Sequence, residues 1–80
     1  MKIEILGTGC RNCLELELLV GKIVSELGLR DVEVSRVDDE RQIRRYIPLD
    51  AIPGLVIDGN LVSERQVPGR ETLKRWLVAT

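Results

Sequence analysis

Two cysteines separated by two residues are the part of this 80-residue sequence best suited to chemistry. Cys10 and Cys13 stand in the segment Gly-Thr-Gly-Cys-Arg-Asn-Cys, residues 7–13. Thiols at positions i and i+3 can close a disulfide with little backbone movement. A thiolate is both a nucleophile and a soft metal ligand. The spacing therefore points to disulfide exchange or to metal binding.

The segments around the cysteines predict where the pair sits. A short apolar run at residues 2–6 predicts a strand, and the leucine-rich residues 14–27 predict a helix that ends at Gly28. Either Cys10 or Asn12 can cap this helix, so the cysteines lie at its N-terminus. Unpaired amide N–H groups and the positive end of the helix dipole stabilise a thiolate there. We therefore expect Cys10 to ionise more readily than a free thiol.

The rest of the chain alternates strand and helix patterns. In order after the first helix, we expect a strand at 32–37, a short helix from Asp38 or Asp39 to about Tyr46, strands at 51–57 and 61–63 around a tight turn at 58–60, and a last helix at 70–78.

The element order βαβαββα predicts the fold class. Short loops favour a right-handed crossover and parallel pairing of the first two strands. The tight turn makes the fourth strand antiparallel to the third. We therefore expect an α/β fold, a four-stranded mixed sheet with helices on both faces, in a single domain spanning residues 1–80.

Composition argues against nucleic-acid and membrane partners. The formal net charge is −1, and the nearest approach to a basic cluster is mixed with acids. At helical spacing this cluster predicts a solvated, ion-paired face; its members are Arg41, Arg44, Arg45, Asp38, Asp39 and Glu40. No apolar run approaches the length of a membrane span, and the N-terminus lacks a signal-peptide pattern. Two cysteines are too few for a secreted disulfide framework, so we expect a cytoplasmic protein.

With the residues laid out this way, the sequence resembles the thioredoxin-like superfamily. More narrowly, it resembles the small thioredoxin/glutaredoxin-like redox-active disulfide proteins of archaea and bacteria. The resemblance covers the whole chain and is strongest at residues 1–10 with Cys13, and at residues 51–59. It implies a thiol–disulfide oxidoreductase that acts on disulfide-containing proteins and is recharged by a disulfide reductase. The redox-active disulfide would be its only redox group, without cofactor or metal.

The resemblance also assigns roles to residues. It implies that Cys10 is the nucleophile, that Cys13 is a buried resolving cysteine, and that a cis Ile52–Pro53 bond faces them. The backbone of Ile52 would then pair with an incoming polypeptide. This sequence departs from thioredoxin proper because Arg11 and Asn12 separate the cysteines and no tryptophan precedes them. The charge of Arg11 should favour the Cys10 thiolate and make the disulfide more oxidising.

Three alternatives use the same cysteines. Two thiolates suit Cu(I), and heavy-metal-associated domains also place CxxC after their first strand. Those domains run βαββαβ and lack the Ile52–Pro53 segment. A zinc site normally takes four ligands, so a dimer would have to complete it. The disulfide could also serve only as a redox switch for binding.

Two further expectations concern side chains near the cysteines. Glu4 lies six residues before Cys10, where thioredoxins carry a buried acid, so it is a candidate for a partly buried proton acceptor for Cys13, unless it points to a solvated rim. Leu14 and Leu18 fall opposite the buried stripe of the first helix, beside the small residues Gly21 and Ser25. They predict an apolar docking strip for a partner protein, unless helix tilt or the loop around Tyr46 buries them.

Overall fold

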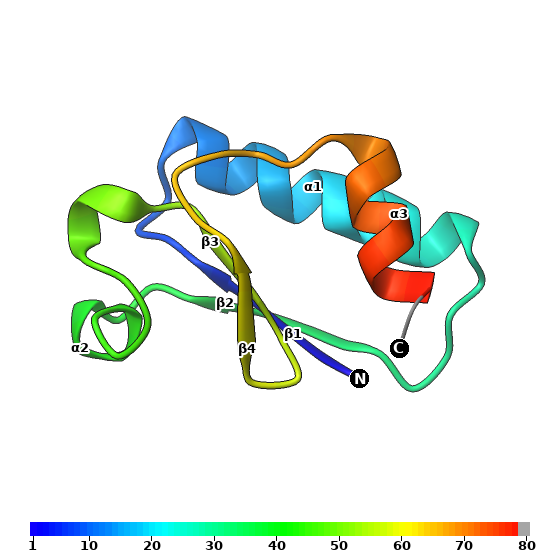
Figure 1. The fold of residues 1–80 in the computed structure, drawn as a ribbon, viewed down its shortest axis with the longest axis horizontal. Helices are drawn as coiled ribbons and strands as arrows, with labels where there is room; N and C mark the ends of the chain where they lie inside the picture. Colours follow the sequence, from blue (N-terminus) through cyan, green and yellow to red (C-terminus); the bar gives the residue numbers. More distant parts are fainter. Residues whose placement is uncertain (79–80) are drawn as a thin grey trace.

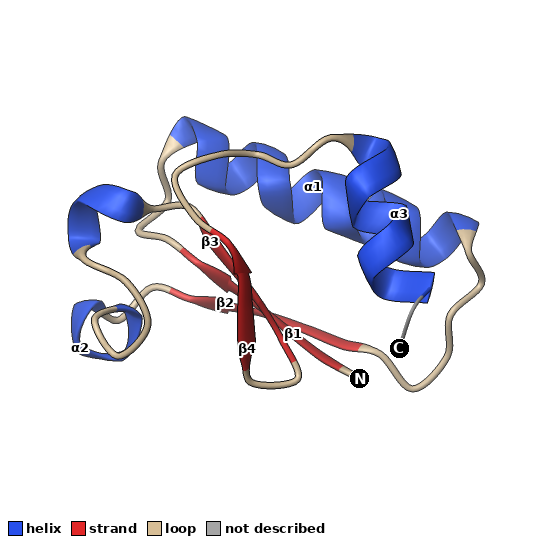
Figure 2. Ribbon diagram, in the orientation of Figure 1, coloured by secondary structure: helices blue, strands red, loops and turns tan. Residues whose placement is uncertain are grey.

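A computed structural model describes residues 1–78 (Figures 1 and 2). The predicted order βαβαββα is confirmed, with one additional 3-10 helix. In chain order the elements are β1 (Lys2–Leu6), α1 (Arg11–Glu26), β2 (Glu33–Val37), α2 (Glu40–Ile43), the 3-10 helix η1 (Leu49–Ala51), β3 (Gly54–Ile57), β4 (Asn60–Ser63) and α3 (Arg70–Val78).

The four strands form one mixed sheet in the order β2-β1-β3-β4. As predicted, β1 is parallel to β2, and β4 is antiparallel to β3. The central strand β1 also pairs antiparallel with β3, in a register that sets Leu6 opposite Gly54. This register brings the C-terminal end of β1 level with the start of β3.

The tight turn between β3 and β4 forms where the sequence predicts it. Asp58 and Gly59 have φ angles of 49° and 83°, the left-handed values that a two-residue hairpin turn requires. The side chain of Asp58 also accepts a hydrogen bond from the Lys2 backbone N–H at 2.7 Å. The hairpin is thereby joined to the start of the central strand.

Alternation along the strands divides the core between the two faces of the sheet. Both long helices, α1 and α3, lie on one face, and α2 lies on the other (Figure 1). Buried residues on the α1 side are Ile3, Ile5, Leu16, Val20, Ile23, Leu55, Ile57, Leu73 and Leu77. Those on the α2 side are Leu6, Val37, Ile43, Ile47, Ala51 and Val56.

The segment before β3 differs from the prediction. The strand begins at Gly54 because Pro53 has no N–H to donate to a sheet ladder. The preceding residues instead form η1, in which the Ala51 N–H donates to the Pro48 carbonyl at 3.0 Å. The second predicted helix is also shorter, since α2 ends at Ile43 and the chain continues to Tyr46 in tight turns.

The arginines around α2 are solvent-exposed as predicted, but the prediction that they form ion pairs is wrong. Within residues 1–78, none of Arg41, Arg44 and Arg45 forms an ion pair with an acid. Pairing at i, i+4 needs a continuous helix, and α2 is a single turn. The Asp39 carboxylate instead caps that turn by accepting the Arg41 backbone N–H at 2.8 Å.

An ion pair joins the two helices on the α1 face of the sheet. The guanidinium of Arg70 at the start of α3 hydrogen-bonds the carboxylate of Glu26 at the end of α1, and the Lys74 ammonium lies 3.9 Å from the same carboxylate. The hydrogen bond from Arg70 holds the pKa of Glu26 below its ordinary value of 4.5.

This ion pair predicts an acid-sensitive contribution to stability. Because the pKa of Glu26 is lower in the folded chain, the contribution is present above pH 4.5 and disappears as the pH falls through the lowered value. We expect Glu26→Gln to reduce this dependence of the free energy of unfolding on pH. The reduction should be modest because the pair is solvent-exposed. Chemical denaturation across acidic pH measures it. Arg70→Gln should behave alike, and an unchanged curve in both variants would contradict the account.

Candidate active site

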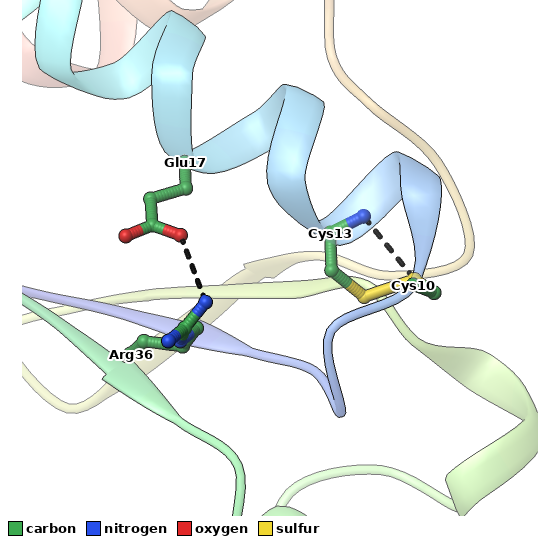
Figure 3. A network of polar contacts seen from close by, with 4 residues as sticks. All are labelled: Cys10, Cys13, Glu17 and Arg36. Carbon is green, nitrogen blue, oxygen red and sulfur yellow. Dashed lines mark hydrogen bonds and ion pairs between the residues drawn. A yellow bond between two sulfur atoms is a disulfide. The ribbon is translucent and has the colours of Figure 1, made fainter.

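The predicted cysteine pair is a disulfide at the N-terminus of α1 (Figure 3). The Cα atoms of Cys10 and Cys13 are 5.0 Å apart. Cys13 is fully buried on the same face of α1 as Leu16, whereas Cys10 is partly exposed. An incoming thiol can therefore approach the Cys10 sulfur from solvent but not the Cys13 sulfur.

Of the two candidate caps, Cys10 is the one that caps α1. Its backbone is extended, and its carbonyl accepts the Leu14 N–H at 3.0 Å. Its Sγ accepts the backbone N–H of Cys13 at 3.2 Å, as Figure 3 shows. Asn12 is exposed and does not cap the helix. The sulfur of this partly exposed cysteine thus already accepts an N–H from the positive end of the helix.

Gly7 provides the space in which Cys13 is buried. A Cβ atom at Gly7 would lie 2.8 Å from the Cys13 Cβ and still closer to its Sγ. Only a residue without a side chain fits between β1 and the first turn of α1. Sequence reasoning missed this role, although a glycine directly after a strand and before a buried cysteine was the available signal.

Pro53 lies beside the same end of β1. The Ile52–Pro53 peptide bond is cis, as the resemblance implies. Because Leu6 pairs with Gly54, the residues on either side of that pair, Gly7 and Pro53, face each other across the two strands. Pro53 is fully buried and Ile52 is partly exposed. The two partly exposed residues, Cys10 and Ile52, thus lie at the same end of the sheet.

Arg11 extends along the outside of α1. Its side chain is 93% exposed and lies 3.7 Å from the carboxylate of Glu15, one turn further on. Solvent and this carboxylate both screen its charge. The effect that we expect Arg11 to have on the Cys10 thiolate is therefore reduced.

The structure does not bring Glu4 together with Cys13. Side chains alternate along β1, and Ile3 and Ile5 pack against α1. Glu4 is half-buried and faces the other side, as does its partner Val56 on β3. The sheet therefore lies between this carboxylate and the disulfide, and direct proton transfer between Glu4 and Cys13 is not supported.

The outer face of α1 carries the two predicted leucines in solvent. Leu14 is 45% exposed and Leu18 is 67% exposed, and Gly21 continues the same exposed line. Ile47, from the loop that could have covered them, packs on the α2 side of the sheet instead. The alternative in which these leucines are buried is therefore wrong.

The described part of the chain offers neither a metal-binding cluster nor a membrane-spanning helix. Within residues 1–78, no three histidine, cysteine, aspartate or glutamate side chains gather in a group that could hold a metal ion. No helix in that range is long and apolar enough to cross a membrane.

Comparison with known proteins agrees with this geometry. The sequence model of the family described as the thioredoxin domain matches residues 1–78. A thioredoxin of Methanothermobacter thermautotrophicus (strain Delta H) is 42% identical over 77 residues, which cover 96% of this chain and 97% of that protein. The likeness thus spans both chains almost completely.

The close approach of Gly7 to Cys13 predicts that a single methyl group added at Gly7 destabilises the folded chain. We expect Gly7→Ala to lower the free energy of unfolding by about 1–3 kcal/mol, because the rigid first turn of α1 must move. The matched control is Gly21→Ala, where a Cβ meets nothing within 4 Å. That exposed helical site should gain about 0.5–1 kcal/mol. Urea denaturation measures both, and equal stability of Gly7→Ala and the wild type would contradict the close approach.

Proposed function

Since this chain belongs to the thioredoxin domain family and is a thiol–disulfide oxidoreductase, we propose that Cys10 is its nucleophile and Cys13 its resolving cysteine. One observation carries this assignment. The Cys10 sulfur caps α1 at a partly exposed position, whereas Cys13 is fully buried against Gly7. The two thiols of the reduced protein are therefore not equivalent.

The first step takes place at the exposed sulfur. The Cys10 thiol gives its proton to solvent, and the thiolate is stabilised by the N–H groups at the start of α1. It attacks one sulfur of a substrate disulfide. The substrate S–S bond breaks, a mixed disulfide with Cys10 forms, and the departing substrate thiolate takes a proton from solvent.

The second step uses the buried sulfur. Cys13 loses its proton, and its thiolate attacks the Cys10 sulfur of the mixed disulfide, which closes the protein disulfide and releases the second substrate thiol. Substrate disulfide and protein dithiol become substrate dithiol and protein disulfide, a transfer of two electrons. Glu4 lies across the sheet and is left out of this step, so the Cys13 proton leaves through solvent or the departing thiolate.

Disulfide-containing proteins are the substrates, and a disulfide reductase restores the dithiol. A reductase thiolate would attack the partly exposed Cys10 sulfur and expel Cys13. Ile52 is partly exposed and precedes Pro53, which lies opposite Gly7 at the end of the sheet where α1 begins, and this placement supports recognition of an extended polypeptide. A copper-chaperone fold would run βαββαβ, whereas the described chain runs βαβαββα. We expect the protein to work in the cytoplasm, where its disulfide stays exchangeable.

Replacing each cysteine by serine tests the two roles. In insulin reduction with dithiothreitol, we expect Cys10→Ser to fall to the rate of the reagent alone, because the remaining thiol, Cys13, is buried. Cys13→Ser, reduced and freed of dithiothreitol before insulin is added, should instead accumulate a mixed disulfide with the substrate, seen by mass spectrometry under nonreducing conditions. Glu4→Gln is the matched control and should keep the wild-type rate. A mixed disulfide trapped at Cys13 by Cys10→Ser would reverse the assignment.

The exposed strip of Leu14 and Leu18 supports a docking role within this function. Leu14 directly follows Cys13 in the chain and lies on the solvent side of the same helical turn. A polypeptide that presents its disulfide to Cys10 would extend over this surface. Contiguous exposed apolar groups beside a reactive centre are typical of a protein contact site.

This strip predicts that its removal weakens the binding of a protein substrate but not of a small disulfide. We expect Leu14→Gln/Leu18→Gln to raise the KM for insulin several-fold and to leave the reduction of oxidised glutathione unchanged, because only the polypeptide reaches the strip. Thermal unfolding is the control and should match the wild type. A large loss of melting temperature, or equal effects on both substrates, would exclude the docking role.

A further inference from the structure

The loop that follows β4 carries an arginine beside the segment that leads to Ile52. The backbone N–H of Arg65 donates to the carbonyl of Ala51 at 2.8 Å, and Ala51 directly precedes Ile52. Figure 1 shows that this loop, the segment before β3 and the start of α1 lie at the same end of the molecule. Arg65 therefore belongs to the end of the sheet that carries the disulfide.

The backbone at Arg65 gives no reason for an arginine at this position. Its φ angle is 64°, in the left-handed region. Within residues 1–78, the other non-glycine residues with left-handed φ values are Asp31 and Asp58. Aspartate is enriched in this region because its short polar side chain can hydrogen-bond locally. A long side chain has no such compensation, and glycine would adopt the same φ angle without strain.

Contacts within the chain do not explain this arginine either. The guanidinium of Arg65 lies 4.0 Å from the carboxylate of Asp50, and the two side chains are 61% and 77% exposed. An exposed ion pair of this kind contributes little to stability. No other acid of the described chain lies within ion-pair distance of the guanidinium. Most of its N–H donors therefore face solvent.

We propose that Arg65 is a substrate-binding residue, which binds the carboxylate of an aspartate or glutamate close to the reactive cysteine of a polypeptide substrate. This inference rests on the proposed function and adds a preference among its substrates. A polypeptide that extends along Ile52 toward Cys10 passes beside Arg65, because Arg65 is bonded to the residue before Ile52. The planar guanidinium can then donate paired N–H bonds to the substrate carboxylate.

Two acids close to Arg65 limit the size of this preference. Asp50 competes for the guanidinium, and the exposed Glu64, which directly precedes Arg65, repels a substrate carboxylate. The contact also forms in solvent, where a charged pair adds only modestly to affinity. We therefore expect an acidic substrate to react about two- to fivefold faster than its neutral counterpart. The preference should decrease as added salt screens the charges.

The test uses a set of synthetic peptides that share one internal disulfide and carry Glu, Gln or Lys in turn at the residues flanking each cysteine. Fully reduced protein, freed of dithiothreitol, is mixed with each peptide, and the second-order rate constant of disulfide exchange is measured. In the wild type the Glu peptide should react faster than the Gln peptide at one or more flanking positions, and the Lys peptide more slowly. Each flanking position is scored by the ratio of the Glu rate constant to the Gln rate constant.

Substitutions near the loop should change this ratio in opposite directions. Arg65→Gly should bring it to about one, without lowering the midpoint of urea denaturation, because glycine adopts the left-handed φ angle without strain. Arg65→Lys should retain part of the preference, since it keeps the charge but not the planar fork. Asp50→Asn should raise the ratio by removing the competing carboxylate. The matched control is Arg30→Gln, which removes a positive charge from an exposed residue in the loop between α1 and β2, and it should keep the wild-type ratio.

The outcomes separate this inference from the function on which it rests. If the wild type reduces the peptides but shows equal rates for Glu and Gln at every flanking position, the inference is overturned and the oxidoreductase mechanism stands. A preference that Arg65→Gly retains, or that Arg30→Gln removes to the same extent, overturns it as well. If the wild type reduces none of the peptides, the mechanism and the inference fail together.

Discussion

The turn from β1 into α1 is the constraint on which the site depends. Within residues 7–10 the chain leaves the sheet and begins a helix whose first turn lies against the end of the strand it has just left. That closeness is possible because Gly7 has no side chain where Cys13 is buried. The same geometry exposes part of the Cys10 sulfur and lets it cap the helix. Burial of one sulfur and capping by the other thus have a single cause.

The strands, the hairpin and the position of the cysteine pair were predictable because each depends on residues close together in sequence. A short apolar run marked β1 and alternating apolar residues marked β2, and the hairpin at Asp58 and Gly59 needs two left-handed residues that this pair tolerates. Gly28, with a φ of 62°, follows the end of α1 where the sequence placed it. The cysteine pair at the helix start followed from the same local patterns. The pairing of β3 with β1 was not predictable in this way, because strand order depends on contacts between residues distant in sequence.

The predictions that failed were those that relied on residue spacing alone. The offset of Glu4 from Cys10 predicts a place near Cys13, yet Glu4 pairs with Val56 and faces the α2 side of the sheet. The pattern Lys2-Ile3-Glu4-Ile5 already put Glu4 opposite the two isoleucines that face α1. Arg44 and Arg45 were paired with acids on a helix that lasts only one turn. Arg11 points along the helix surface toward Glu15, which a linear sequence does not reveal.

The central claim is that one geometry makes the two thiols unequal, with Cys10 reactive and Cys13 shielded. Competitive alkylation of the fully reduced protein at neutral pH, followed by peptide mapping over time, tests it most directly. The account predicts that Cys10 is labelled first and that Cys13 is labelled only when the chain is denatured. Equal labelling rates, or faster labelling of Cys13, would contradict it.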